Sequence, residues 1–294
     1  MNQQKNKCII SGTSGFVGSH IKSCFLKNEW EVYELKHTVQ NGNLNNKNLI
    51  PYSLEDGIDN KIFQNIDALI HCAYDFKQTK WNDIFNVNVN GSIKLLRAAK
   101  SAGLQKIIFI SSIAAFDNCK SMYGRAKLEI EKEALRIGAI VIRPGLVYGQ
   151  NPGGMFGALN KITSVFPVIP VIGNGNNPMF LIHIEDLCKL VYKLSADEIK
   201  NPSNYIIAAH EKGKTFRDVL DILLNSKGRK ALYIPIPYSL VFTMLKVVES
   251  LGLQIRFRSD SLISMMNYDP NPHFNSEILK SIPIREFNIQ NLKS

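Results

Sequence analysis

Three residues in this chain of 294 residues have the types and spacing needed to move a proton: Ser112, Tyr123 and Lys127. Tyr123 and Lys127 are four residues apart, so a helix would place both side chains on one face. A free phenol has a pKa of about 10, and a neighbouring ammonium is expected to lower the pKa of Tyr123 by favouring the phenolate. Tyr123 could then exchange a proton with an alcohol or ketone oxygen, to which Ser112 would hydrogen-bond.

A run of glycines near the N-terminus predicts the partner of that chemistry. It follows the apolar residues 8–10 and precedes a helical pattern, with the spacing Gly-x-x-Gly-x-x-Gly. Glycines at a strand-to-helix turn let backbone N–H groups approach a pyrophosphate, and the helix N-terminus adds favourable charge. The loop is therefore predicted to bind a dinucleotide, and with Tyr123 and Lys127 it indicates hydride transfer to or from a nicotinamide. The loop residues expected to contact the cofactor are Gly12, Ser14, Gly15, Phe16, Val17 and Gly18.

The end of the next strand bears on the choice between NAD and NADP. An NAD site usually has an acidic residue there, which accepts a hydrogen bond from the ribose 2′-OH. The pattern 31–36 instead ends in Lys36, whose charge would attract a 2′-phosphate. NADP(H) is therefore slightly favoured over NAD(H), although Glu34 would favour NAD(H) if the strand ended two residues earlier.

Strand and helix patterns alternate through the first half, which predicts an α/β fold with a Rossmann-like, doubly wound parallel sheet. A small C-terminal α/β lobe for the substrate is expected to follow. The predicted domains are a dinucleotide-binding domain with the catalytic residues at 1–150 and a substrate-binding lobe at 151–294, with elements from 179–209 rejoining the first. The predicted strands are 7–11, 31–35, 67–72, 106–111, 139–143, 179–183 and 205–208, and the predicted helices are 16–27, 81–102, 123–137, 155–163, 185–194, 216–225 and 238–251.

Composition limits the class of protein. An apolar content of 45% and a charged content of 20% are typical of a globular protein. Five scattered cysteines without a C-x-x-C pair favour a reducing, cytoplasmic setting, and no leader or integral membrane segment is expected. A net charge of +10 suits phosphorylated ligands, whereas no nucleic-acid-binding motif or metal-ligand spacing is found. The apolar helix at 238–251 is expected to form a core or dimer face rather than a membrane anchor.

The chain resembles the extended branch of the short-chain dehydrogenase/reductase superfamily, the NAD-dependent epimerase/dehydratase-like proteins that modify nucleotide sugars. The segments that carry the resemblance are 12–18, 71–73, 88–91, 111–112, 123–127, 143–149 and 183–186. The resemblance implies bound NAD(P), catalysis by Ser112, Tyr123 and Lys127, and a homodimer. It implies that Asn88 supports the active-site helix and its proton relay. It also places Ala73 and Arg143 among the cofactor-binding residues and Tyr148 near the substrate.

Departures from the family pattern bear on the substrate. Met179 stands where many nucleotide-sugar members have an arginine, and Arg256 and Arg258 could supply the missing charge. The expected function is an NAD(P)-dependent oxidoreductase or epimerase acting on a hydroxyl or ketone of a nucleotide-linked sugar. Two alternatives remain: an NADPH-dependent reductase of a non-nucleotide carbonyl such as a lipid, sterol or small aldehyde or ketone, and a non-catalytic NAD(P)-binding sensor or scaffold.

Overall fold

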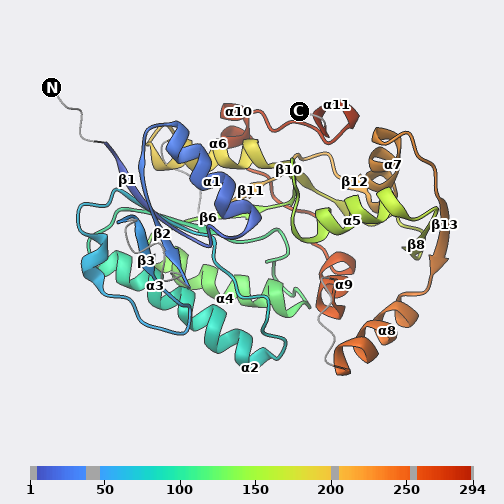
Figure 1. The fold of residues 1–294 in the computed structure, drawn as a ribbon, viewed down its shortest axis with the longest axis horizontal. Coiled ribbons are helices and arrows are strands. Elements are labelled where there is room, and N and C mark those ends of the chain that lie inside the picture. Colours follow the sequence, from blue (N-terminus) through green and yellow to red (C-terminus); the bar gives the residue numbers. More distant parts are fainter. Residues whose placement is uncertain (1–4, 38–46, 200–204, 252–256, 293–294) are drawn as a thin grey trace.

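Short strands rich in Ile and Val alternate with amphipathic helices, and this pattern builds a parallel sheet. The computed structural model describes residues 5–37, 47–199, 205–251 and 257–292, and in it seven strands pair in the order β11-β6-β5-β4-β1-β2-β3 (Figure 1). Every pairing in this sheet is parallel, so the predicted Rossmann-like fold is confirmed. The strands are β1 (Lys7–Ser11), β2 (Glu31–Lys36), β3 (Leu49–Pro51), β4 (Ala68–His71), β5 (Lys106–Ile110), β6 (Ile140–Pro144) and β11 (Tyr205–Ala208).

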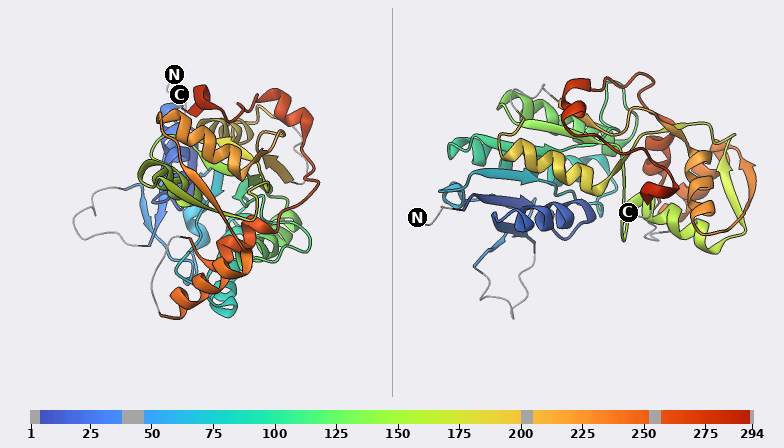
Figure 2. Two further views of the ribbon diagram at one scale, coloured as in Figure 1. Left: turned by 90° about the vertical axis from the view of Figure 1, so that its right-hand side faces the viewer. Right: turned by 90° about the horizontal axis from the view of Figure 1, so that it is seen from above.

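Helices cover both faces of the sheet because both faces of each central strand are apolar. Ile10 packs into one core with Phe25 and Leu187, which come from α1 (Phe16–Lys27) and α6 (Ile184–Ser195). The adjacent Ile9 points to the other face, where α3 (Gly91–Ser101) and α4 (Met122–Arg136) pack. Figure 2 shows α1 and α6 side by side on their face.

The predicted single helix 81–102 is three elements: α2 (Trp81–Ile84), the π-helical turn η2 (Phe85–Asn90) and α3. A π turn adds one residue to a helical turn, and a 3.6-residue hydrophobic period does not reveal it. The turn buries the Asn88 side chain beside the loop that follows β4.

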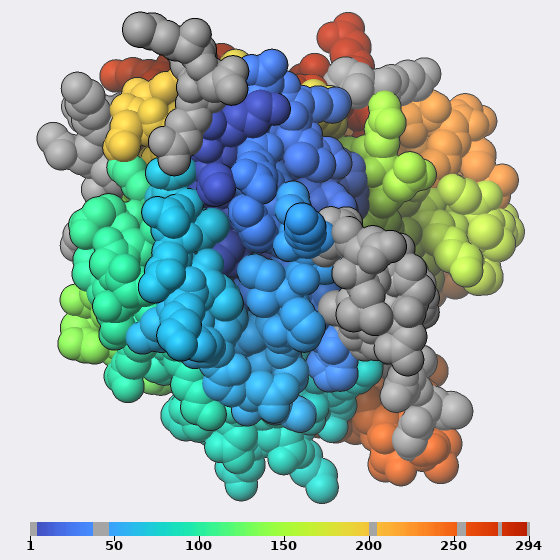
Figure 3. All heavy atoms as spheres, turned by 60° about the vertical axis from the view of Figure 1, so that its left-hand side comes forward, coloured from blue at the N-terminus to red at the C-terminus, as the bar shows by residue number. Residues whose placement is uncertain are grey.

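The C-terminal elements form a third core around Phe156, Leu220 and Phe287. Figure 3 shows the N-terminal elements, in blue, covering one side of the molecule, while the green-yellow and orange C-terminal elements lie together at its edge. Three two-stranded pairs join this region, and the predicted strand 179–183 is divided between two of them. The elements are β7 (Leu146–Tyr148) with β10 (Leu181–His183), β9 (Pro178–Met179) with β12 (Lys214–Thr215), β8 (Val168–Ile172) with β13 (Leu232–Ile236), and the helices α5 (Gly154–Val165), α7 (Phe216–Ser226), α8 (Tyr238–Ser250), α9 (Ser259–Met266), α10 (Ser276–Ser281) and α11 (Ile289–Leu292).

Helix α8 does not form a core face, which is one of the two roles that the sequence predicts for it. It forms where the pattern 238–251 predicts it, but it buries none of its residues, so its apolar face is not part of a core. It packs against α9 near the cavity described below. None of the helices in the described part of the chain has the length and apolar character needed to cross a bilayer.

Candidate active site

The glycine loop follows β1 and passes close to the loop after β4. Gly12 has φ +76°, and a Cβ there would lie 2.7 Å from the Ala73 amide nitrogen. A Cβ on Gly18 would lie 2.3 Å from the Gly12 carbonyl oxygen, so α1 can approach the loop only without a side chain there. The Ser11 hydroxyl accepts hydrogen bonds from the amides of Cys72 (3.1 Å) and Ala73 (3.3 Å), which joins the two loops.

Gly15 differs from the other two glycines. A Cβ there would meet only the Gly12 carbonyl oxygen, at an ordinary 3.4 Å, so packing within the chain does not require a glycine. Gly15 precedes the first residue of α1, and no side chain caps the N–H groups of that first turn. Uncapped N–H groups beside a residue without a side chain form a cradle for an anion. The loop therefore fits the pyrophosphate of a dinucleotide.

At the end of β2, one carboxylate and two lysines lie side by side. The strand extends to Lys36, and Lys36 Nζ is 3.3 Å from Glu34 Oε2, while Lys22 Nζ is 3.1 Å from Glu34 Oε1. Burial acts to raise the pKa of Glu34, but the Thr13 hydroxyl and the two ammonium groups outweigh it and hold that pKa below its usual value. This end of the sheet thus offers both an acid and two cations to a ribose.

The three predicted catalytic residues meet at the neighbouring strand end. Helix α4 carries Tyr123 and Lys127, and Ser112 follows β5, with its hydroxyl hydrogen-bonded to the Tyr123 phenol. Lys127 is buried, donates a hydrogen bond to the Ile110 carbonyl oxygen (2.8 Å), and lies 6.0 Å from the Tyr123 ring centroid. Since β5, β4 and β1 are neighbours, this group, Ala73 and the glycine loop follow one another along the carboxyl edge of the sheet.

The electrostatics of this group differ from the expectation. Burial raises the pKa of Tyr123 to about 12, and the hydrogen bond from Ser112 opposes that rise only in part. Burial also lowers the pKa of Lys127 to about 8, against the attraction of Cys72 and Glu131. The sequence predicts that the ammonium and a cationic nicotinamide together lower the Tyr123 pKa. In the chain without a cofactor, desolvation of the phenol dominates and raises that pKa instead.

Two aromatic rings enclose the Tyr123 ring. Tyr74 contacts it edge-on with ring centroids 5.0 Å apart, and Phe76 stacks on it at 5.8 Å. Both rings come from the loop after β4, which Asn88 holds: its Oδ1 accepts from the Asp75 amide (2.6 Å) and its Nδ2 donates to the Asp75 carbonyl oxygen (3.0 Å). Asn88 thus supports the wall against which the phenol packs.

A carboxylate from far along the chain holds the start of α4. Asp260, on α9, accepts hydrogen bonds from the amides of Met122 (2.7 Å) and Tyr123 (3.0 Å), and it is itself buried. The amide of Lys120, just before α4, donates to Asn267 Oδ1 (2.7 Å) at the other end of α9. These contacts tie the C-terminal elements directly to the helix that carries the phenol.

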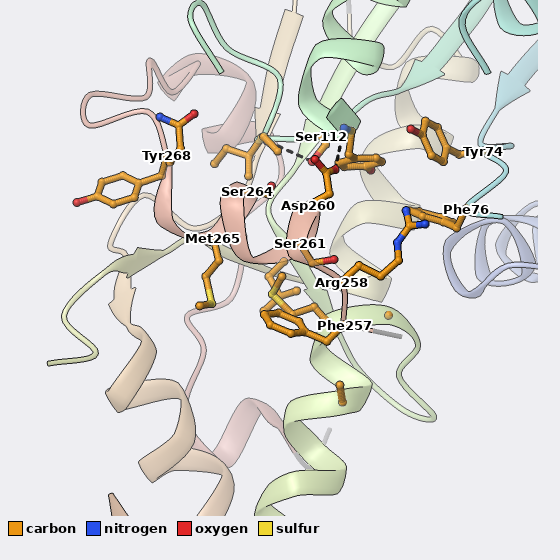
Figure 4. Close-up of a pocket in the computed structure, with 18 of the residues that line it drawn as sticks. Tyr74, Phe76, Ser112, Phe257, Arg258, Asp260, Ser261, Ser264, Met265 and Tyr268 are labelled. Carbon is orange, nitrogen blue, oxygen red and sulfur yellow. Dashed lines mark hydrogen bonds between the residues drawn. The ribbon is translucent and has the colours of Figure 1, made fainter. Parts of the chain in front are cut away.

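A cavity of about 1340 Å³ lies between the sheet edge and the C-terminal elements. Ser112, Asp260 and Tyr74 lie toward one side of it, whereas Phe257 and Met265 point to the opposite, apolar side (Figure 4). The cations Lys77 and Arg258 also line the cavity, and the Arg258 side chain extends toward Phe76. The hydroxyl-bearing groups therefore face a space with both polar and apolar walls.

Comparison with known proteins agrees with this geometry. A model of the NAD dependent epimerase/dehydratase family matches residues 8–208. The chain belongs to this family. It is 28% identical over 208 residues to the uncharacterized protein y4nG of Sinorhizobium fredii, covering 64% of this chain and 52% of that one. It is 26% identical over 215 residues to a UDP-glucose 4-epimerase of Vibrio cholerae, covering 62% and 64%. The chain thus spans between half and two thirds of the length of these two relatives.

Solved structures show the same fold. A UDP-glucuronic acid 4-epimerase of Bacillus cereus in complex with NAD superposes with a TM-score of 0.65, at 21% identity, over 79% of this chain and 88% of that one. The family match and this fold confirm the resemblance found in the sequence.

Within this family fold, some predicted residues lie elsewhere than expected. Arg143 is buried and bonded to Glu131 (Nη2 to Oε2, 2.6 Å), with its guanidinium 4.0 Å from the Tyr205 ring centroid. Tyr148 is fully buried in the C-terminal core and is not among the residues that line the cavity, so its contact with substrate stays a prediction. Arg256 lies outside the described residues.

Three residues of the site escaped the sequence patterns. Tyr74 and Phe76 lie in a loop without periodicity, and Asp260 is 137 residues from its partner Tyr123. The sequence shows Asp260 only as an acid two residues after Arg258. A capping contact between distant elements leaves no spacing that a sequence pattern could reveal.

Proposed function

We propose that this protein is an NAD(P)-dependent oxidoreductase or epimerase that acts on a hydroxyl or ketone of a nucleotide-linked sugar. The observation that carries the proposal is the meeting of the Ser112 hydroxyl and the Tyr123 phenol at one wall of the large cavity, beside the buried Lys127 ammonium. A bound nicotinamide supplies the hydride donor or acceptor.

The chain's own residues handle the proton. With its pKa raised to about 12, the Tyr123 phenol is protonated at neutral pH and ready to donate to a ketone oxygen. The Ser112 hydroxyl, next to the phenol, hydrogen-bonds the same substrate oxygen. Lys127 is held by the Ile110 carbonyl, and its ammonium favours the phenolate once the proton has left. Tyr74 and Phe76 keep water from one side of the phenol.

Two cations support the nucleotide-linked class of substrate. Lys77 and Arg258 line the cavity and would pair with a diphosphate, as an ammonium and a guanidinium generally do. Arg258 lies two residues before Asp260, so the side chain that would hold the diphosphate and the one that caps α4 belong to the same segment.

Substitution of Tyr123 by Phe tests this mechanism. We expect turnover of nucleotide sugars, followed by chromatography of the products, to fall by about 10²- to 10⁴-fold because the proton donor is lost. NADPH affinity, measured by fluorescence titration, should stay within about twofold because the ring remains. Tyr268→Phe is the matched control, since Tyr268 also lines the cavity but lies away from Ser112. Full activity of the Tyr123→Phe variant would reject the mechanism.

A second candidate is an NADPH-dependent reductase of a non-nucleotide carbonyl. The apolar cavity wall, with Met155, Met179, Phe257 and Met265, favours it. Thermal unfolding with UDP, dTDP, ADP and GDP separates the two proposals: the first expects at least one nucleoside diphosphate to raise the melting temperature, and the second expects none to do so. Tight NAD(P) binding without turnover of any nucleotide sugar or carbonyl would instead favour a cofactor-binding sensor or scaffold.

A further inference from the structure

Exposed apolar side chains gather at the C-terminal end of the molecule, away from the sheet. Sixteen large apolar side chains are exposed among the described residues, and ten of them lie in just two stretches, 165–168 and 232–251. The first stretch leads into β8, and the second contains β13 and α8; the two meet where β8 and β13 pair. We call the exposed apolar residues of these two stretches the C-terminal apolar surface; their elements lie at one end of the molecule in Figures 1 and 2.

The β8–β13 pair contributes one part of this surface. Ile169 and Val171 point inward and are buried, as the alternation of a strand requires. A solvent-facing side of such a pair is usually polar, yet here Val168 and its partner Leu232 are both exposed, as is Ile234.

Helix α8 contributes the other part. Leu240, Met244, Val247 and Leu251 are all more than half exposed, and their spacing of four, three and four residues places them in one stripe. On another side, the same helix lines the cavity with Lys246, and its Glu249 accepts hydrogen bonds from the Ser259 amide (2.6 Å) and hydroxyl (2.9 Å). The helix is thus held on one side and presents an apolar stripe on the other.

Basic residues outnumber acidic ones in and beside the two stretches. The second stretch contains Glu249, which lies 3.5 Å from the Lys246 ammonium and is bonded to Ser259, and Asp221 accepts a hydrogen bond from the Tyr233 hydroxyl on β13. Residues 151–184 contain one lysine and no acid, and residues 222–248 contain four lysines or arginines and no acid. Lys227 donates to the Asn160 carbonyl oxygen (2.7 Å), and Arg229 donates to the Val165 carbonyl oxygen (3.3 Å), which keeps two of the cations at the edge of the surface. Lys161, Lys230 and Lys246 are exposed.

We propose that the C-terminal apolar surface docks onto an anionic lipid bilayer. An exposed apolar stripe surrounded by cations suits the boundary between headgroups and acyl chains, where the apolar side chains enter and the cations meet lipid phosphates. A second copy of this chain fits less well, because two such surfaces would bring together an excess of positive charge with few acids to pair with it. Docking needs neither cofactor nor substrate, so it does not depend on the proposed function.

Flotation with lipid vesicles tests the proposal. The purified full chain should bind vesicles of phosphatidylcholine with phosphatidylserine, bind phosphatidylcholine alone much more weakly, and bind less as salt rises. Leu240→Ser combined with Val247→Ser should weaken binding at least about tenfold because two apolar anchors are lost. Lys230→Ala should weaken it about fivefold. Leu26→Ser is the matched control, since Leu26 on α1 is 51% exposed and Leu240 is 52% exposed.

Thermal unfolding and NADPH titration establish whether each variant is folded. If the variant with both serine substitutions is not folded, the Lys230→Ala variant tests the proposal instead. Failure to bind anionic vesicles, or equal binding by the wild type and both surface variants, would overturn the proposal. Sedimentation tests the alternative that a second copy of this chain covers the surface. A dimer that the double variant dissociates, without any vesicle binding, would assign the surface to a second copy and overturn docking to lipid.

Discussion

The carboxyl edge of the main sheet and the C-terminal apolar surface use apolar residues in opposite ways. At the sheet edge, the apolar side chains of β1 and β5 are buried on both faces, and the polar groups bond to one another: Ser11 to two amides, and Ser112 to Tyr123. At the C-terminal end, β13 and α8 expose apolar side chains on one side. The two regions are joined through α9, which caps α4 with Asp260.

This difference separates two tasks. The atoms that move a proton need fixed positions, and close packing around the sheet edge provides them. The C-terminal elements line the cavity from the other side and face outward, so their residues can vary with the ligand while the chemistry stays the same. Changes in the first region should therefore alter cofactor binding or turnover, whereas changes in the second should leave cofactor affinity unchanged.

The largest effect is expected at the glycine loop. Gly18→Ala would place a Cβ 2.3 Å from the Gly12 carbonyl oxygen, and we expect a loss of about 3 kcal/mol in unfolding free energy together with weak NADPH binding. Gly15→Ala has room within the chain, so its stability should change by less than about 0.5 kcal/mol. NADPH affinity should still fall by at least about tenfold, because the new methyl group lies where the pyrophosphate approaches.

Chemical denaturation and fluorescence titration measure these two quantities. Gly57→Ala is the control, since a Cβ there meets nothing within 4 Å. If Gly15→Ala loses stability without losing affinity, the loop is a packing turn rather than a cofactor cradle. If both variants behave alike, the distinction between Gly15 and Gly18 is wrong.

Asp260 tests the connection between the two regions and should have an intermediate effect. Asp260→Ala leaves the amides of Met122 and Tyr123 without their acceptor, which should cost about 1–2 kcal/mol of stability. Because Tyr123 is one of those two residues, kcat should fall by about tenfold while NADPH affinity is retained. Asp260→Asn keeps one acceptor oxygen and should recover part of the loss.

Asp59→Ala separates positioning from stability. Asp59 also caps a helical turn, accepting from the Lys61 amide (2.9 Å), but it is exposed and lies outside the cavity. Its loss should lower the melting temperature without changing kcat. An Asp260→Ala enzyme with normal kcat would mean that α9 stabilises the fold but does not position the phenol.

The sequence patterns predict the first region well and the second poorly, for physical reasons. Strand and helix periods depend on local burial, so β1, α1 and β11 appear with their observed bounds. The Ser112, Tyr123 and Lys127 group follows from two local spacings and the order of strands. The exposure of α8 depends instead on what the rest of the chain leaves uncovered, and apolar periodicity does not report it. The raised pKa of Tyr123 depends on burial by Tyr74 and Phe76, which are distant in sequence.

The smallest expected effect concerns cofactor choice at the end of β2. Glu34 is already balanced by Lys22 and Lys36, which leaves one positive charge in excess for a 2′-phosphate. Lys36 is partly exposed, so its contribution should be modest: Lys36→Ala should lower the ratio of NADPH to NADH affinity by about fivefold. Lys27→Ala removes the same charge from the far end of α1 and should leave the ratio unchanged. An unchanged ratio in the Lys36→Ala variant would mean that Lys36 serves only to neutralise Glu34, and Glu34 would then be the residue that meets the ribose.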